Sequence, residues 1–360
     1  MDLASTTALS DDFKLISELD KIKKLSIPTP SFSEIHNCLL QTLREFGTTS
    51  TPACKHIVGH SRTGKSFAVR EFEAKFPPVR TTAGLKKEVI YVQAPVQGTI
   101  KGVMEALLEA LGDPHWMVGS YSSMLARLLQ LLRQVGCKMI ILDEFQHLAD
   151  KGQRAILKRT TDWLKVLVER NSFSLVCVGL PASLRIIRST EQLRTRFDAT
   201  IEVPVYDWTN EQSRKVFRSV VHSIQKDMFP FEVPDLGSEQ LSLRMFIACA
   251  GRIGLLSKIL DRAVKSAIWE NRTAIRLEHL DSAFRNAIWF AEEIPVPGGP
   301  FFGALSLDSA PELYKQAMLL AEHVPAEEED KKTHLGSMQS VGGKKQSRKK
   351  IKNELTRIFG

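Results

Sequence analysis

The stretch HIVGHSRTGKS, residues 56–66, joins a short apolar segment to a turn with glycine at both ends. Its spacing is Gly59, four residues, and then Gly64, Lys65 and Ser66, which is the Walker A pattern. Glycines let backbone N–H groups wrap phosphate oxygens because no Cβ obstructs their approach. We therefore expect a nucleoside triphosphate here, with Lys65 at the β- and γ-phosphates and Ser66 on Mg2+. The predicted nucleotide-binding residues are Gly59, His60, Ser61, Arg62, Thr63, Gly64, Lys65 and Ser66.

A second motif follows about 75 residues downstream. Residues 139–144, MIILDE, are a continuous apolar run that ends in two acids, as is typical of a parallel strand buried on both faces. At the carboxyl end of that strand, Asp143 is predicted to hold Mg2+ and Glu144 to polarise the water that attacks the γ-phosphate. The two motifs together predict an ATPase that uses ATP and Mg2+.

The rest of the chain predicts an α/β fold. Apolar segments that read as strands alternate with helical segments, at Lys55–Val58, Glu88–Gln93, Met139–Asp143, Ser174–Val178 and Ala199–Val203. This alternation favours a doubly wound parallel sheet flanked by helices, with ligands at the carboxyl ends of the strands. Both motifs then lie at that edge. Residues 207–291 contain only helical apolar periods, which predict a small all-helical lid domain.

These patterns predict five parts of the chain. They are an N-terminal extension at 1–30, an ATP-binding α/β domain at 31–206, the lid domain at 207–291, a Pro/Gly linker with a short helix at 292–325, and a charged tail at 326–360. The net charge of +8 is concentrated in that tail, because residues 331–360 carry nine lysines and arginines against one glutamate. Such a tail is suited to phosphate backbones or an acidic partner, or serves only solubility.

Composition also excludes some classes of protein. No apolar run approaches 18 residues, and the N-terminus lacks a basic region followed by an apolar stretch. The five cysteines are odd in number and widely separated. We therefore expect no membrane span, no signal peptide, no disulfide framework and a cytoplasmic location.

The connection between the second and third strands is unusually long. Between Gln93 and Lys138 there is room for two helices, at about 99–135, whereas a plain crossover needs one. An extra helix at this place resembles initiator-type AAA+ ATPases, in which it faces DNA. Lys101, on the leading helix, is the predicted contact to the DNA backbone.

The order and spacing of several motifs resemble the TniB family of AAA+ transposition ATPases, related to TnsC and more distantly to IstB. The motifs are GHSRTGKS at 59–66, ILDEF at 141–145, Val178-Gly179, QLRTRF at 192–197 and GRIG at 251–254. The resemblance implies a homo-oligomer, ring or filament, that assembles on double-stranded DNA with ATP. It also implies a DDE-type transposase and a target-site selection protein as partners, with ATP hydrolysis driving disassembly.

The resemblance also assigns roles to individual side chains. Arg196 occupies the place of an arginine finger that reaches the γ-phosphate of a neighbouring subunit, and Arg194 is the alternative. Gln93, at the end of the second strand, is a candidate partner of Glu144 in a switch. Arg252 is a candidate nucleotide ligand from the lid.

Two departures from the wider AAA+ pattern predict slow hydrolysis, with ATP acting mainly as an assembly switch. The sensor position after the fourth strand is often polar, but Val178-Gly179 is followed here by Leu180-Pro181. Many relatives also carry arginine at the fourth position of the lid motif, where this chain has Gly254. Two alternative functions stay open: a helicase-loader or replication-initiation ATPase, and a signalling NTPase that binds no DNA.

Overall fold

The computed structural model describes residues 29–48, 52–82, 84–96, 98–148, 154–169, 173–226, 228, 231–305 and 310–321. The predicted basic tail lies outside the described residues, as does nearly all of the predicted N-terminal extension. No helix in the described part of the chain is long and apolar enough to cross a membrane.

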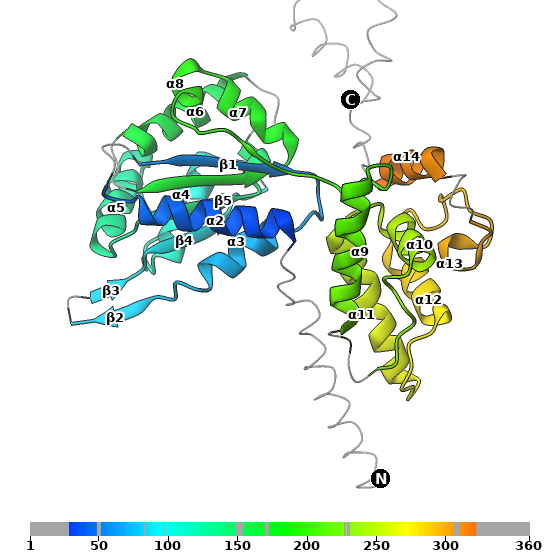
Figure 1. Ribbon diagram of the computed structural model, residues 1–360. Helices are drawn as coiled ribbons and strands as arrows, with labels where there is room; N and C mark the ends of the chain where they lie inside the picture. The colour runs from blue at the N-terminus through cyan, green and yellow to red at the C-terminus, as the bar shows by residue number, and fades with distance from the viewer. Residues whose placement is uncertain are drawn as a thin grey trace, which may run out of the picture. The chain divides into compact units, whose positions relative to one another are not determined.

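A five-stranded parallel sheet forms the centre of the nucleotide-binding part (Figure 1). Its order is β4-β5-β6-β1-β7, and the strands are β1 (Cys54–Gly59), β4 (Val89–Gln93), β5 (Met139–Asp143), β6 (Ser174–Gly179) and β7 (Ile201–Val203). The predicted parallel α/β sheet is thus confirmed. The last strand begins two residues later than expected from its sequence. A separate hairpin, β2 (Val79–Thr81) and β3 (Gly84–Lys86), was not predicted.

Strand β5 is buried on both faces, as its continuous apolar run predicts. Successive side chains alternate between faces, so Met139 and Ile141 enter one hydrophobic cluster while Ile140 and Leu142 enter the other. Both layers hold the strand in place. The carboxylate at its end, Asp143, therefore sits at a fixed position on the sheet edge.

Helices cover both faces of this sheet. On one face, α2 (Pro30–Arg44) and α3 (Lys65–Glu73) contribute Ile35, Leu39 and Phe72 to the cluster around Met139. On the other face lie α4 (Ile100–Ala110), α5 (Tyr121–Gln134), α6 (Arg154–Glu169), α7 (Leu184–Arg188) and α8 (Glu191–Arg194). Two short 3-10 turns, η1 (Phe145–Leu148) and η2 (Pro181–Ser183), follow β5 and β6.

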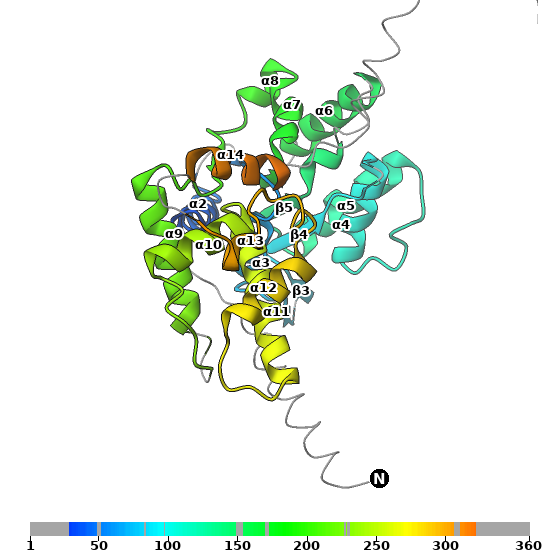
Figure 2. The ribbon, with the colours of Figure 1, turned by 90° about the vertical axis from the view of Figure 1, so that its right-hand side faces the viewer.

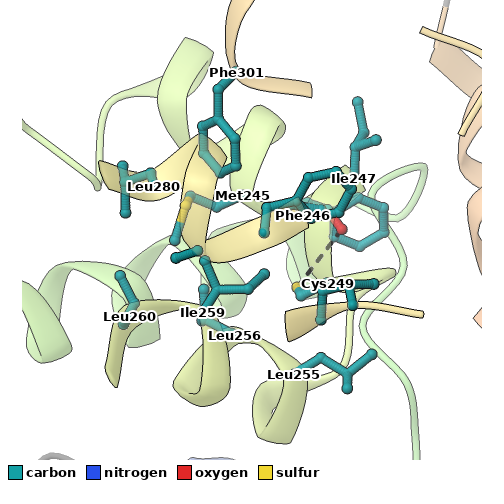
Figure 3. Packing of buried hydrophobic residues seen from close by; sticks show 14 of the residues in the cluster. Met245, Phe246, Ile247, Cys249, Leu255, Leu256, Ile259, Leu260, Leu280 and Phe301 are labelled. Atoms are coloured by element: carbon teal, nitrogen blue, oxygen red, sulfur yellow. Dashed lines mark hydrogen bonds between the residues drawn. The ribbon is translucent and has the colours of Figure 1, made fainter. Parts of the chain in front are cut away.

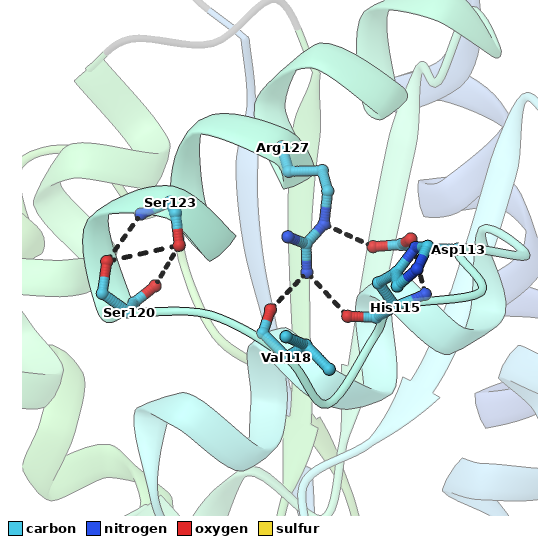
Figure 4. A network of polar contacts seen from close by, with 6 residues as sticks. All are labelled: Asp113, His115, Val118, Ser120, Ser123 and Arg127. Atoms are coloured by element: carbon cyan, nitrogen blue, oxygen red, sulfur yellow. Dashed lines mark hydrogen bonds and ion pairs between the residues drawn. The ribbon is translucent and has the colours of Figure 1, made fainter.

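The crossover from β4 to β5 contains two helices, α4 and α5, which lie side by side (Figures 1 and 2). The loop between them, residues 111–120 (the insertion loop), is closed by Arg127 of α5 (Figure 4). The Arg127 guanidinium donates to the Asp113 carboxylate at 2.5 Å and to the carbonyls of His115 and Val118 at 2.8 and 2.9 Å. The His115 N–H and the Arg127 cation hold the pKa of Asp113 below its usual value.

The second part of the fold is helical. Its helices are α9 (Glu211–Lys226), α10 (Glu239–Cys249), α11 (Ile253–Trp269), α12 (Leu277–Ala287), α13 (Gly299–Phe302) and α14 (Ala310–Ala321). Their core includes Phe246 from α10, Ile259 from α11, Leu280 from α12 and Phe301 from α13 (Figure 3). Because α10 and α11 are buried over most of their length, the Gly251–Gly254 turn between them is tied to a packed core.

Candidate nucleotide site

The loop at residues 59–66, here called the phosphate loop, follows directly from the end of β1. Gly59 lies so close to β7 that a Cβ there would sit 2.5 Å from the Val203 carbonyl oxygen. Gly64 has φ +99°, which favours glycine, and it caps the N-terminus of α3. The loop therefore leaves the sheet at a point that only glycine fits and enters a helix whose N-terminal dipole favours anions.

Lys65 is folded back onto this loop. Its Nζ donates to the His60 carbonyl at 2.5 Å, and the Thr63 hydroxyl donates to the same carbonyl at 2.9 Å. The side chain is 6% exposed, and burial lowers the pKa of Lys65 to about 8 despite the attraction of Asp143 and Glu144. Among the described residues, Lys65 forms no ion pair, so its positive charge has no close negative partner.

The Asp143 carboxylate is held by groups on both of its oxygens. The Tyr91 hydroxyl donates to Oδ2 at 2.8 Å, and the Glu144 N–H donates to Oδ1 at 2.8 Å. Arg70 of α3 donates in turn to the Tyr91 hydroxyl at 2.9 Å, and its guanidinium lies over the tyrosine ring, 5.2 Å from the centroid. Burial and the Asp143 charge raise the pKa of Tyr91, so its hydroxyl stays protonated as a donor.

Glu144 lies just beyond the strand in an uncommon backbone conformation. Its φ is +53°, in the left-handed region that a non-glycine residue rarely adopts. Its carboxylate accepts a hydrogen bond from the Gln146 amide, and the Gln146 Oε1 accepts from the Leu180 N–H at 3.0 Å. The predicted partner, Gln93, is exposed and has no hydrogen bond to Glu144. Gln93 pairs in register with Asp143, and the amide that contacts Glu144 in this structure is Gln146, on the turn that follows. A switch contact from Gln93 stays a prediction.

The lid turn reaches the phosphate loop at two points. Arg252 is 3% exposed and donates from Nη1 to the Ser61 carbonyl at 3.1 Å. The Gly254 N–H donates to the Arg62 carbonyl at 2.8 Å, and a Cβ on Gly254 would stand 2.9 Å from the same oxygen. This close approach explains why glycine occupies the fourth position of the lid motif. The arginine of this turn is Arg252, two positions earlier, and its guanidinium lies beside the phosphate loop.

Beside the loop lies a cavity of about 270 Å3. Its walls are mainly apolar and come from α2, α3, the end of β7 and α11, and they include Phe32, Phe67, Tyr206 and Ile253. Thr29 at its rim caps α2 by accepting from the Phe32 N–H at 3.1 Å. A flat, largely apolar nucleobase fits such a cavity, with its phosphates at Gly64.

The remaining predicted residues lie apart from this site. Arg194 and Arg196 are exposed, at the end of α8 and just after it. Lys101 is 57% exposed on the first turn of α4, where it pairs with Glu105 at 3.5 Å. Its position on the insertion agrees with an outward-facing role, but an exposed pair of this kind contributes little to stability.

The donor set fits a nucleotide with Mg2+. Lys65 offers an ammonium without a carboxylate partner, and Ser66 and Asp143 offer the oxygen ligands that Mg2+ prefers. Ser66 lies in the first turn of α3, next to Lys65, and Asp143 lies at the end of β5. The phosphate loop and the nucleobase cavity adjoin, since both include Thr63 and Gly64.

Sequence reasoning missed three features of the site. They are the pair Tyr91 and Arg70, the amide of Gln146, and the residues that line the apolar cavity. Tyr91 reads only as a strand residue, and its role depends on the neighbouring strand. Gln146 follows Asp143 by three residues, and it is a polar side chain that is buried in the turn after β5. That polarity was the one signal the sequence offered.

Solved structures share this fold. Cdc6p from Pyrobaculum aerophilum matches with a TM-score of 0.57 at 15% identity, covering 88% of this chain and 89% of that chain. The Aeropyrum pernix ORC1 protein in complex with DNA matches with a TM-score of 0.52 at 18% identity, covering 85% and 78%. The Aeropyrum pernix ORC2 protein in ADPNP-ADP complexes also matches, with a TM-score of 0.52 at 14% identity, covering 73% and 70%. At these identities the likeness establishes the fold alone.

The parallel sheet, the phosphate loop, the acids at the end of β5 and the helical lid define an AAA+ ATPase. Residues 23–208 match the family described as bacterial TniB protein. The chain belongs to the TniB family. No curated protein matches it in sequence.

Proposed function

We propose that this protein regulates DNA transposition by assembling on double-stranded DNA when it binds ATP. The assembled homo-oligomer, a ring or a filament, recruits and activates a DDE-type transposase, and a target-site selection protein guides it. Hydrolysis of ATP releases the assembly. Membership of the TniB family carries this proposal. The geometry of the phosphate loop and of the two acids at the end of β5 supports a nucleotide-dependent mechanism.

In this proposal Lys65 binds the β- and γ-phosphates once they replace its bond to the His60 carbonyl. Ser66 and Asp143 hold Mg2+, which neutralises charge on the phosphates. Tyr91 keeps the Asp143 carboxylate oriented toward the phosphate edge. Glu144 accepts the proton of the attacking water.

The finger role of Arg196 requires a second copy of the chain. Its exposure leaves the guanidinium available to a neighbouring subunit, and a cation supplied in this way makes hydrolysis depend on assembly. Arg194 is equally exposed and stays the alternative. Lys101 is proposed to contact the DNA backbone from the insertion, after exchanging Glu105 for a phosphate.

The test is electron microscopy of Glu144→Gln with duplex DNA and ATP, beside wild-type protein with ADP. We expect Glu144→Gln to bind ATP, to lose at least about a hundredfold in hydrolysis rate, and to persist as rings or filaments on DNA. Wild-type protein with ADP should show none. Monomers of Glu144→Gln that hold ATP on DNA would contradict the assembly proposal and favour a loader or signalling ATPase.

A further inference from the structure

The orientation of the Gln146 side chain is fixed by its two partners. Its Oε1 accepts from the Leu180 N–H at 3.0 Å. Because a backbone N–H can only donate, the carboxamide oxygen must face Leu180 and the NH2 group must face Glu144. The hydrogen bond from Nε2 to the Glu144 Oε2 follows from this orientation.

The surroundings of Gln146 leave room for this one arrangement. Gln146 is 4% exposed, so both ends of its amide need partners. A Cβ on Gly179 would stand 2.7 Å from the Gln146 Oε1 and 3.1 Å from the Ser183 hydroxyl. The absence of a side chain at Gly179 is therefore what admits the amide between β5 and β6.

This amide lies where the sequence lacks a polar group. The two residues that follow β6 are Leu180-Pro181, and neither has a polar side chain. Gln146 brings a carboxamide to the same edge from η1, and it is bonded to the Leu180 main chain. The carboxyl edge of the sheet therefore has an amide group next to the end of β6, and this group comes from η1, after β5.

The same bond holds Glu144 in a costly conformation. A non-glycine residue rarely adopts the left-handed region because its Cβ crowds the backbone there, and Glu144 has φ +53°. Three hydrogen bonds oppose that cost: the Glu144 N–H donates to the Asp143 carboxylate, the Glu144 carbonyl accepts from the His147 N–H at 3.0 Å, and the Glu144 carboxylate accepts from the Gln146 amide. Among these bonds, the one from Gln146 is made to the Glu144 carboxylate, whereas the others involve the Glu144 backbone.

We propose that Gln146 is a positioning residue for hydrolysis: it fixes the Glu144 Oε2 and leaves Oε1 to accept the proton of the attacking water. The inference rests on the proposed role of Glu144. It assigns Gly179 a supporting role, since any larger residue there displaces the amide.

The experiment compares Gln146→Met with wild-type protein in steady-state and single-turnover hydrolysis of labelled ATP. Methionine keeps the length of the side chain and removes both hydrogen bonds. We expect kcat to fall about tenfold to a hundredfold, as for a misplaced catalytic group, with KM changed less than about twofold. Gly179→Ala should lower kcat in the same direction, because it displaces Gln146 without removing the amide.

The decisive comparison is made in the Glu144→Gln background. If Gln146 acts through Glu144, Gln146→Met should change the residual rate of that variant less than about twofold. An equal loss in both backgrounds, an unchanged kcat in Gln146→Met, or a faster kcat would each overturn the proposal. If Glu144→Gln hydrolysed ATP at the wild-type rate, the proposed role of Glu144 would be refuted. That outcome is distinct from those that overturn only the role of Gln146.

Discussion

The phosphate loop and the insertion loop are closed in the same way and differ in one respect. In each, a cation from the following helix donates to backbone carbonyls of the loop: Lys65 to His60, and Arg127 to His115 and Val118. Arg127 also has the Asp113 carboxylate at 2.5 Å. Lys65 has carbonyl and hydroxyl oxygens only.

Of the two loops, the insertion loop is the one whose cation is neutralised without a ligand. The insertion loop carries its own anion, so its cation is neutralised within the fold. In the phosphate loop the ammonium is buried against weaker acceptors, and burial lowers its pKa to about 8. A charge that is poorly compensated in this way is stabilised by an incoming anion, and that is what a phosphate supplies.

The largest effect should follow from removing the cation of the phosphate loop. Lys65→Ala should weaken ATP binding by at least about a hundredfold, since it removes a charge-assisted contact to the phosphates. Isothermal titration calorimetry measures this directly. Arg127→Met is the matched control from the other loop, and it should bind ATP like wild-type protein. Similar losses of ATP affinity in both variants would contradict the comparison.

The next effect should follow from removing the cation of the insertion loop. Arg127→Met leaves the Asp113 carboxylate, 5% exposed, without its cationic partner and with only the hydrogen bond from the His115 N–H. We expect the free energy of unfolding to fall by about 1–3 kcal/mol, measured by urea denaturation. Arg133→Met, an exposed arginine on the same helix, should change it by less than about 0.5 kcal/mol. Equal losses would show that the contacts of Arg127 with the insertion loop add nothing specific to stability.

ATP binding at the phosphate loop should also depend on pH, with a smaller effect. The lowered pKa means that Lys65 of the free protein loses its proton above about pH 8, whereas bound phosphates favour the ammonium. ATP affinity should therefore be highest below pH 8 and fall up to about tenfold per pH unit above it. Calorimetry in buffers of different ionisation enthalpy should detect proton uptake on binding. Affinity that stays constant between pH 7.5 and 9.5 would place the Lys65 pKa well above the predicted range.

Sequence alone could predict the parts of the site that are adjacent along the chain. The phosphate-loop residues Gly59 to Ser66 and the acids after β5 could be predicted because each set is contiguous in sequence and the two patterns occur together. The bond from Tyr91 to Asp143 could not be predicted, since it crosses from one strand to the next. The bond from Gln146 to Glu144 is local in sequence, but it depends on the left-handed turn at Glu144, which no residue pattern specifies.

The apolar cavity beside the phosphate loop illustrates the same limit. Its walls come from α2, α3 and α11, segments up to about two hundred residues apart, and no local pattern marks them. The glycine in the lid motif reads as a departure in sequence. In the structure it is a consequence of contact with the phosphate loop.

The two contacts between the lid turn and the phosphate loop have a consequence for regulation. Arg252 and Gly254 both bond to carbonyls of the loop that surrounds the phosphates. Coupling between two sites is reciprocal in free energy. Suppose that a partner draws α11 away from the loop and thereby weakens ATP binding by some factor. ATP then weakens the binding of that partner by the same factor. A partner with equal affinity for both lid positions leaves nucleotide occupancy unchanged, however tightly it binds.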